Sequence, residues 1–258
     1  MAVSTRSYAR SFSNSGGLPN GIKWLLIINI GVFLLQSFGG ETLGTVFSYL
    51  VLIPEAVVKL FFIWQPFTYM FLHGGIGHVL WNMLALWMFG TELERTWGTR
   101  RFLQFYLLCG TGAGVVVVIA NYMFGNPGVA TVGASGAIYG LLLASAMLWP
   151  DRMMLFNFLI PLKMKYYAMI VGALAFMGSF NLNSGVSEVA HLSGMLFGYL
   201  QLKQSGHRGS GVIQALQERY EAWRLARAKR RFRVYLNKHG SDKFGSDKFG
   251  SDKDSWKN

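Results

Sequence analysis

The stretch 129-VATVGASGAIYGLLLASAML-148 is apolar enough to cross a membrane, yet a serine, Ser135, lies near its start among glycines and alanines. Polar side chains are costly in lipid and point to function. Gly133, Gly136 and Gly140 recur three and four residues apart, which leaves one helix face open to close approach by another helix. The stretch therefore predicts a membrane helix that packs tightly against a second helix, with a hydroxyl at the contact.

The composition indicates a membrane protein. Hydrophobic residues make up 52% of the 258 residues and charged residues only 14%, whereas a soluble domain carries about 25% charged residues. The net charge of +12 does not indicate a nucleic-acid partner, because fourteen of the 24 lysines and arginines follow residue 202. The single cysteine, Cys109, lies in an apolar run and is interpreted as a small buried hydrophobe.

Six segments are long and apolar enough to be spans, at about 20 residues each. They cover residues 22–39, 69–90, 102–124, 132–149, 165–182 and 186–204. Backbone groups in lipid must be satisfied within the segment, so this pattern predicts an all-α, polytopic six-helix bundle. No small-residue cleavage site follows the first run, so we expect it to be retained as a span.

The loop charges set the predicted orientation and the domain limits. Basic residues alternate loop by loop and enrich the side that holds both termini, so the termini are expected in the cytoplasm and the chain in the inner cell membrane. This predicts a cytoplasmic segment over 1–21, a membrane domain over 22–204 and a basic cytoplasmic tail over 205–258. The aromatic 40–68 loop on the opposite side is expected in the membrane interface.

The tail has two parts. Residues 212–237 have helical periodicity and an arginine-rich face, which fits either a solvated helix or adhesion to the anionic inner leaflet. A GSDKF repeat over 240–254 follows and is predicted to be disordered. We assign the repeat no function.

Four polar residues inside the predicted spans form one candidate site. His78 and Asn82 are four residues apart on one face of span 2, while Ser135 and His191 lie at similar shallow depths in spans 4 and 6. Gly194 and Gly198 follow His191, so spans 4 and 6 can meet along faces of small residues. His78 and Asn82 reach the same depth only if span 2 begins higher or tilts.

This set predicts nucleophilic catalysis. Ser135 beside a base, His191, is an activated nucleophile. The side chains of His78 and Asn82, with the Ser135 amide, are the expected donors to an oxyanion, and Tyr139 is expected to pack on the imidazole. The spans hold no acidic residue near His191, and Glu188 lies closer to the surface, so we expect a Ser–His dyad. The histidines lack metal-site spacing, so neither a metal nor another cofactor is expected.

With these residues in view, the chain over about 22–204 resembles the rhomboid intramembrane serine proteases. Gly133-Ala134-Ser135-Gly136 is similar to the family's Gly-x-Ser-Gly nucleophile motif, and Ala190-His191-Leu192-Ser193-Gly194 to the Ala-His-x-x-Gly motif of its base. The sequence HVLWN over 78–82 is similar to the family's His-x-x-x-Asn motif, and Glu94-Arg95 to its charged pair after span 2. Where many relatives have Trp-Arg in the first outside loop, this chain has Trp64-Gln65, which removes a charged anchor of that loop.

The resemblance implies a fold, an activity and partners. The fold is the six-helix bacterial form, and the activity is cleavage of transmembrane proteins in or near their spans, with the active site open to the outer side of the bilayer. Substrate would enter between spans 2 and 5, beside Trp81 and Phe176. The oligomeric state does not follow from the resemblance.

Two other function classes fit parts of the pattern. A bundle of this kind without the dyad would bind and hold client membrane proteins, but Ser135 and His191 are both present. A small transporter or proton relay built on His78 and His191 predicts repeats between the two halves of the chain, and none is apparent.

Overall fold

The structure is a computed structural model that describes residues 17–156, 160–179, 188–208 and 227. The chain divides into the units Met1–Lys203 and Gln204–Asn258, and the features described below lie in the first unit, apart from the last residues of α9. Apart from Arg227, the predicted tail helix over 212–237 and the repeat over 240–254 lie outside the described residues. The proposed domain limits stay a prediction.

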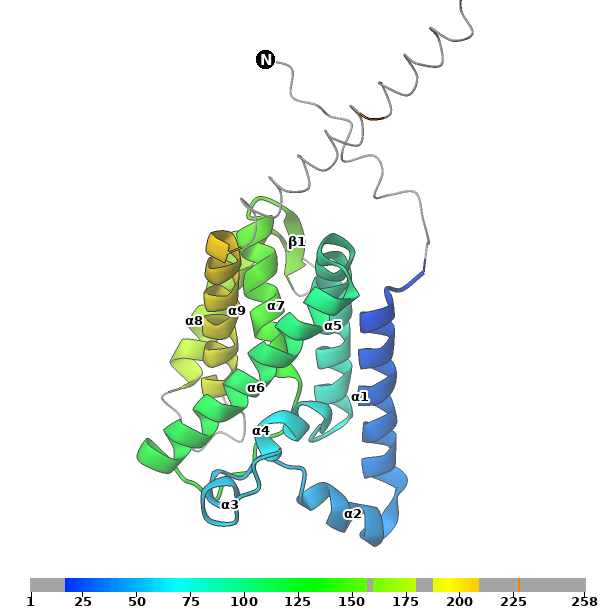
Figure 1. Ribbon diagram of the computed structural model, residues 1–258, viewed down its shortest axis with the longest axis vertical. Coiled ribbons are helices and arrows are strands. Elements are labelled where there is room, and N and C mark those ends of the chain that lie inside the picture. The colour runs from blue at the N-terminus through cyan, green and yellow to red at the C-terminus, as the bar shows by residue number, and fades with distance from the viewer. Residues whose placement is uncertain (1–16, 157–159, 180–187, 209–226, 228–258) are drawn as a thin grey trace, which may run out of the picture. The chain divides into compact units, whose positions relative to one another are not determined.

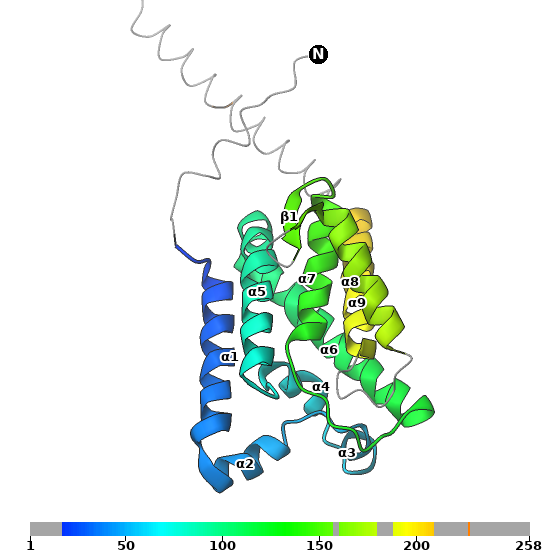
Figure 2. The same ribbon diagram turned by 180° about the vertical axis from the view of Figure 1, so that it is seen from behind.

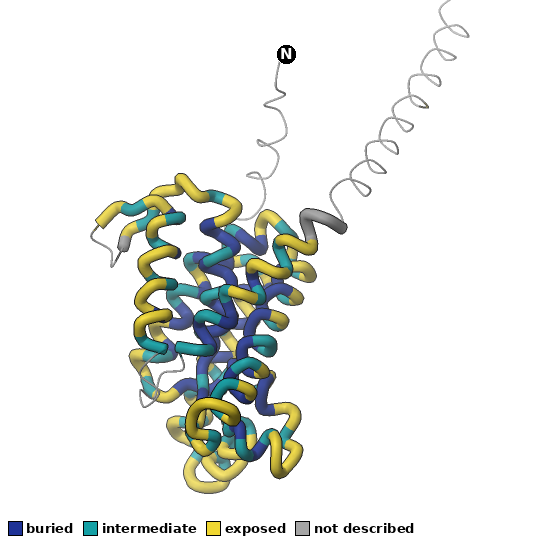
Figure 3. Tube along the Cα trace, turned by 90° about the vertical axis from the view of Figure 1, so that its left-hand side faces the viewer, coloured by how far each residue is buried: buried dark blue, intermediate teal, exposed yellow. Residues whose placement is uncertain are grey.

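Each predicted span corresponds to a helix of the first unit. These helices are α1 (Asn20–Phe38), α5 (Ile76–Trp97), α6 (Thr99–Phe124), α7 (Ser135–Leu148), α8 (Met164–Gly178) and α9 (Glu188–Arg208). Helices α1, α5, α7, α8 and α9 run alongside one another, and α6 slants across them (Figure 1). Because α7 packs against α5, α6 and α8, it forms the centre of the bundle, and the buried residues line the facing sides of the helices (Figure 3).

The helices differ in how well they match a membrane span. Among the described residues, α1 and α6 are long and apolar enough to cross a membrane, and α7 and α8 are apolar but shorter. Helices α5 and α9 have 22 and 21 residues but carry the polar residues of the candidate site. The mostly helical fold is as expected, while the count of six spans stays a prediction.

The second predicted span begins at the wrong residue. It was expected from residue 69, but α5 begins at Ile76, and Tyr69–Phe71 form a single 3-10 turn, η2. Gly74 and Gly75 lie just before α5, and glycine is a poor helix former. Because α5 begins at Ile76, His78 lies in the first turn of its helix, as Ser135 and His191 do in theirs. The difference in depth between His78 and these two residues that the sequence suggests therefore does not arise.

Helix α7 is short because the chain before it is buried without being helical. Its 14 residues give a rod of roughly 21 Å, against a hydrocarbon thickness of about 30 Å. The preceding residues Thr131, Gly133 and Ala134 are buried. Non-helical backbone is tolerated at such depth when protein surrounds it and its polar groups are satisfied. The Gly133 N–H accordingly donates to the Tyr69 carbonyl at 2.9 Å.

A cap of short helices closes the end of the bundle where α7 begins. Helices α2 (Gly40–Ser48), α3 (Pro54–Lys59) and α4 (Gln65–Thr68) form it, and Figure 2 shows the chain before α7 running past α3. Gln65 is fully buried, accepts from the Ile53 N–H at 3.0 Å and donates to the Tyr49 carbonyl at 3.3 Å. Hydrogen bonds of the uncharged Gln65 side chain therefore anchor the 40–68 loop, in which many relatives have an arginine at this position.

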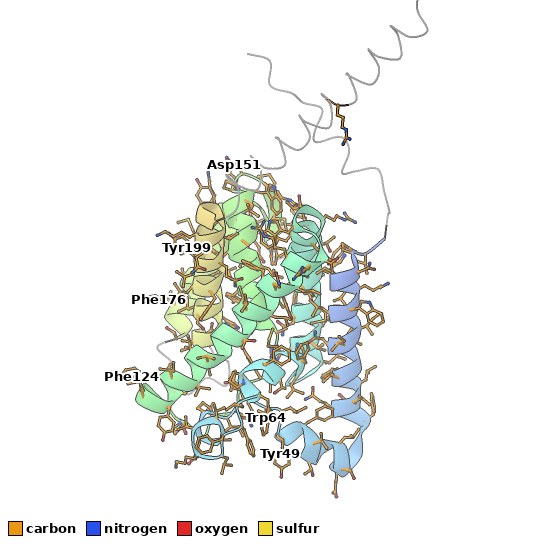
Figure 4. All side chains as sticks on the ribbon, in the orientation of Figure 1. Tyr49, Trp64, Phe124, Asp151, Phe176 and Tyr199 are labelled. Carbon is orange, nitrogen blue, oxygen red and sulfur yellow. The ribbon has the colours of Figure 1, made fainter. Side chains whose placement is uncertain are left out.

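A short β-hairpin accompanies the helices of this mostly helical fold. Strands β1 (Met153–Phe156) and β2 (Ile160–Lys163) form an antiparallel pair with Met153 opposite Lys163. Asp151 lies just before β1, at the opposite end of the bundle from Tyr49 and Trp64 (Figure 4). Hydrogen bonds from Lys165 and Lys163 hold the pKa of Asp151 below its ordinary value.

Glu94, on α5, ties three helices together. One carboxylate oxygen accepts from the Gly21 N–H at 2.7 Å and the Thr99 hydroxyl at 2.6 Å, and the other accepts from the Ile22 N–H at 2.7 Å. The first turn of a helix has N–H groups without intrahelical acceptors and a partial positive charge. A carboxylate that is 3% exposed therefore caps α1 from a neighbouring helix and fixes it beside α5 and α6.

Candidate active site

Ser135 is the first residue of α7, and the backbone before it requires glycine. Gly133 has a φ of +124°, a conformation that side chains disfavour. A Cβ at Gly133 would also lie 2.7 Å from both Cε1 and Nε2 of His78. The glycine therefore turns the chain into α7 and lets the imidazole of His78 approach the backbone beside Ser135.

The structure brings Ser135 and His191 together. His191 Nε2 lies 2.8 Å from Ser135 Oγ, across 56 residues of sequence. The approach depends on small residues where α7 meets α9: a Cβ on Gly194 would overlap the Gly136 carbonyl, and one on Gly198 would lie 3.0 Å from the Gly140 carbonyl. The contact between spans 4 and 6 along faces of small residues is the arrangement that the sequence predicts.

Tyr139 packs on the imidazole. The rings of Tyr139 and His191 stack with centroids 4.1 Å apart and planes 4° from parallel. Tyr139 lies one turn after Ser135 on α7, so a single helix presents the hydroxyl and the surface that orients the ring bonded to it. This placement agrees with the role expected for Tyr139.

His191 also has a carboxylate neighbour, which the sequence analysis did not expect. Glu188 Oε2 lies 2.8 Å from His191 Nδ1. Helix α9 begins at Glu188, and residues three apart lie on the same helix face. The i, i+3 spacing of Glu188 and His191 is the sequence feature that indicates this contact. The position of Glu188 near the end of the predicted span favours exposure to water instead.

His78 and Asn82 face the same point from α5. A Cβ on Gly133 would lie 3.7 Å from Asn82 Nδ2 and 2.7 Å from His78 Nε2. The Gly74 N–H donates to His78 Nδ1 at 3.4 Å, which favours the tautomer with hydrogen on Nε2. Asn82 is 6% exposed, and within the described residues its Nδ2 has no hydrogen-bond partner. Two donors therefore point to the backbone beside Ser135.

His73 supports His78 from outside the helix. The His73 ring meets the His78 ring edge-on at 5.2 Å, and the backbone N–H of His73 donates to Gln36 Oε1 on α1 at 3.1 Å. The described residues contain no group of three or more His, Cys, Asp or Glu side chains with the geometry of a metal site. The link from α1 through His73 to His78 was not apparent in the sequence.

The two residues named for substrate entry lie on the surface. Trp81 on α5 is 61% exposed and Phe176 on α8 is 56% exposed. Figure 4 marks Phe176 on the outer flank of α8. Both side chains are therefore exposed, and the entry route between these helices stays a prediction.

The fold and the site together define a class: a helical membrane protein with a serine, a histidine and aligned hydrogen-bond donors at one buried point. A family model described as the Rhomboid domain matches residues 61–203, more than half of the chain. The chain belongs to the rhomboid family, whose members cross the membrane several times.

Several relatives extend this result. The rhomboid protease GluP of Bacillus subtilis (strain 168) is 31% identical over 189 residues, which cover 71% of this chain and 35% of GluP. RHOMBOID-like protein 1 of Arabidopsis thaliana is 37% identical over 142 residues, or 54% of this chain and 33% of that protein. The rhomboid protease AarA of Providencia stuartii is 28% identical over 197 residues, or 68% of this chain and 69% of AarA. The chain thus spans about a third of the length of the first two relatives.

Proposed function

We propose that this protein is an intramembrane serine endopeptidase that cleaves membrane proteins in or near their transmembrane segments. The observation that carries the proposal is the 2.8 Å contact between His191 Nε2 and Ser135 Oγ. Membership of a family with members named as proteases supports the same conclusion.

The proposed chemistry begins with attack by Ser135. Its Oγ adds to the carbonyl carbon of the scissile bond while His191 Nε2 takes the hydroxyl proton. The carbonyl oxygen becomes an oxyanion, and the donors placed to stabilise it are Asn82 Nδ2, His78 Nε2–H and the Ser135 N–H. The Ser135 N–H is available because the first residues of an α-helix have no intrahelical acceptor.

The intermediate then collapses in the usual order for acyl transfer. Protonated His191 gives its proton to the amide nitrogen, the C–N bond breaks, and an ester remains on Ser135. Water attacks that ester, with His191 again taking the proton. The bond to Ser135 Oγ then breaks, His191 returns the proton to Oγ, and the acid product leaves. A helical substrate must unwind first, because its scissile carbonyl is hydrogen-bonded within its own helix.

The topology is part of the proposal. We infer six spans, with the end of the bundle that carries Asp151 in the cytoplasm and the cap of α2, α3 and α4 on the outer side. The helix ends, the hairpin and the connections at the Asp151 end hold the basic residues Arg95, Arg100, Arg101, Arg152 and Lys163. The positive-inside rule supports this orientation, which gives Ser135 access to water from outside. Reporter fusions at residues 128 and 258 are expected to be external and cytoplasmic, respectively.

The proposed function is tested by reconstituted cleavage. Purified wild type, Ser135→Ala and His191→Ala would be placed in liposomes with a single-pass substrate whose fragments are identified by mass spectrometry. Ser145→Ala is the matched control, since Ser145 is buried on the same helix, ten residues further along. We expect wild type and the control to cut and to react with a fluorophosphonate, while Ser135→Ala does neither.

Each other outcome has a definite meaning. Cleavage by Ser135→Ala at the wild-type rate contradicts the assigned nucleophile. A folded wild type that neither cuts any of several substrates nor reacts with the fluorophosphonate contradicts the protease proposal. Binding of client membrane proteins would then be the function to test.

A further inference from the structure

The candidate site includes a carboxylate that has no role in the chemistry proposed above. Beyond the imidazole of His191, on the side away from Ser135, lies the carboxylate of Glu188, 2.8 Å from Nδ1. The Glu188 side chain is 20% exposed and that of His191 is 10% exposed. A carboxylate, an imidazole and a hydroxyl thus lie in sequence, joined by two contacts of 2.8 Å each.

We propose that Glu188 is the positioning residue of His191, so that the site works as a Glu–His–Ser triad. The inference rests on the proposed function, because it assigns a role within the same reaction. Glu188 touches neither the reacting bond nor Ser135, and it acts only through the imidazole.

The physical role follows from which nitrogen each neighbour contacts. A carboxylate only accepts hydrogen bonds, so Nδ1 must carry hydrogen and the lone pair of Nε2 must face Ser135 Oγ. This is the tautomer that a base for Ser135 requires. When His191 takes the proton, the imidazolium gains a charge-assisted bond to the carboxylate, and 2.8 Å is within the range of such bonds.

A purely structural role would use the carboxylate differently. An acidic residue in the first turn of a helix interacts favourably with the helix dipole wherever its side chain points. In this structure the side chain is directed to His191, which is its ion-pair partner within the described residues. In the part of the chain that the structure describes, the imidazole also has His78 on α5 and Tyr139 on α7 as ionisable neighbours. Neither supplies a negative charge at Nδ1.

The position of the carboxylate is also enforced from α8. A Cβ on Gly178, the last residue of α8, would lie 2.8 Å from Cγ and 3.2 Å from Oε1 of Glu188. Cγ is close to the backbone, so an added methyl group must move the whole carboxyl arm. The glycine therefore leaves the space in which Glu188 turns toward His191.

The first test replaces the charge and keeps the shape. Glu188→Gln and Glu188→Ala are compared with wild type for kcat and KM on the single-pass substrate and for the rate of fluorophosphonate labelling. The control is Glu41→Gln, the same change at an exposed residue of α2. We expect kcat and the labelling rate to fall roughly 10- to 100-fold in the Glu188 variants, with KM within about twofold of wild type.

The expected size reflects the setting of Glu188. Loss of the buried aspartate in soluble Ser-His-Asp hydrolases costs about 10⁴-fold in kcat. The loss here should be smaller because Glu188 is partly exposed and the Tyr139 ring also holds the imidazole. The split between kcat and KM provides a readout that a merely structural role would not produce, because the loss of an interaction made only in the transition state lowers kcat and leaves KM unchanged.

The second test does not alter Glu188. Gly178→Ala favours the helix by its intrinsic propensity but displaces the carboxyl arm, so it should lower kcat without lowering the melting temperature. In the Glu188→Ala background the arm is absent, and adding Gly178→Ala should cost little more. Non-additivity of this kind identifies residues that act through one contact.

The outcomes separate the inference from the function on which it rests. A Glu188→Gln variant within threefold of wild type in kcat and in labelling rate overturns the inference, while wild-type cleavage preserves the protease proposal. Should the Glu188 variants fail to fold, full activity in folded Gly178→Ala overturns it instead. A wild type that neither cuts nor labels at Ser135 overturns the proposed function, and the inference with it.

Discussion

Glu94→Gln should destabilise the bundle without changing the chemistry. The substitution keeps one acceptor oxygen and replaces the other by an NH₂ group. With the least loss, this NH₂ group takes the place of Oε2 and faces the Ile22 N–H, while the remaining oxygen still accepts from the Gly21 N–H and the Thr99 hydroxyl. Losing one hydrogen bond to a charged group costs about 1.5–3 kcal/mol, and the two that remain each lose about 1 kcal/mol of charge assistance. The free energy of unfolding should therefore fall by about 3–5 kcal/mol.

The assay is thermal unfolding in detergent, followed by circular dichroism. At about 2–4 °C per kcal/mol for a domain of this size, the melting temperature should fall by roughly 6–20 °C. Glu92→Gln is the matched control, because Glu92 lies two residues earlier on α5 and pairs with Arg152 at a partly exposed site. Such pairs contribute about 0–1 kcal/mol. Equal melting temperatures for the two variants would refute the argument that the buried carboxylate fastens α1.

The other predictions concern the candidate site and the hairpin. Asn82→Ala removes one oxyanion donor and should lower kcat about 10²-fold with little change in KM; a loss below threefold would contradict that role. Tyr139→Phe keeps the ring stacked on His191 and should retain activity, whereas Tyr139→Ala should lose about 3- to 10-fold in kcat/KM, since stacked rings contribute about 0.5–1.5 kcal/mol. The pKa of Asp151 is lower in the folded protein than in the unfolded chain, where it is about 3.9. Its ion pairs therefore stabilise the hairpin above that pH, and the stabilisation is lost as the pH falls through the folded pKa. Asp151→Asn should therefore speed amide exchange slightly in β1 and β2 at pH 6, and the variant and wild type should converge near pH 2.

The close helix contact was predictable because it depends on a local spacing. Gly133, Gly136 and Gly140 on one segment and Gly194 and Gly198 on another are readable as faces that allow close approach. No larger side chain fits at Gly194, where a Cβ would overlap the Gly136 carbonyl. Because these glycines allow α7 and α9 to pack closely along one pair of faces, their spacing alone predicts a large part of the fold.

The start of α5 and the pairing of Glu188 were not predicted, for different reasons. The apolar run before α5 continues through Tyr69–Phe71, and hydropathy does not distinguish a buried turn from a helix. The contact of Glu188 depends on how far its side chain turns inward, which in turn depends on the space left by Gly178. That space depends on how α8 packs against α9, and no periodic pattern in the sequence indicates it.

Apart from Asn82, the polar residues of the site share one structural setting, the first turn of a helix. Ser135 opens α7, His78 is the third residue of α5, and Glu188 and His191 are the first and fourth of α9. First-turn N–H groups have no intrahelical acceptors and carry partial positive charge, so they favour a nearby anion. If the proposed reaction is correct, its oxyanion forms where α7 already supplies such groups. This setting would stabilise the charge without a metal ion or a buried cationic side chain. It would also restrict the reaction to the depth at which these helices begin, so a substrate segment could be cut only where its unwound backbone reaches that level.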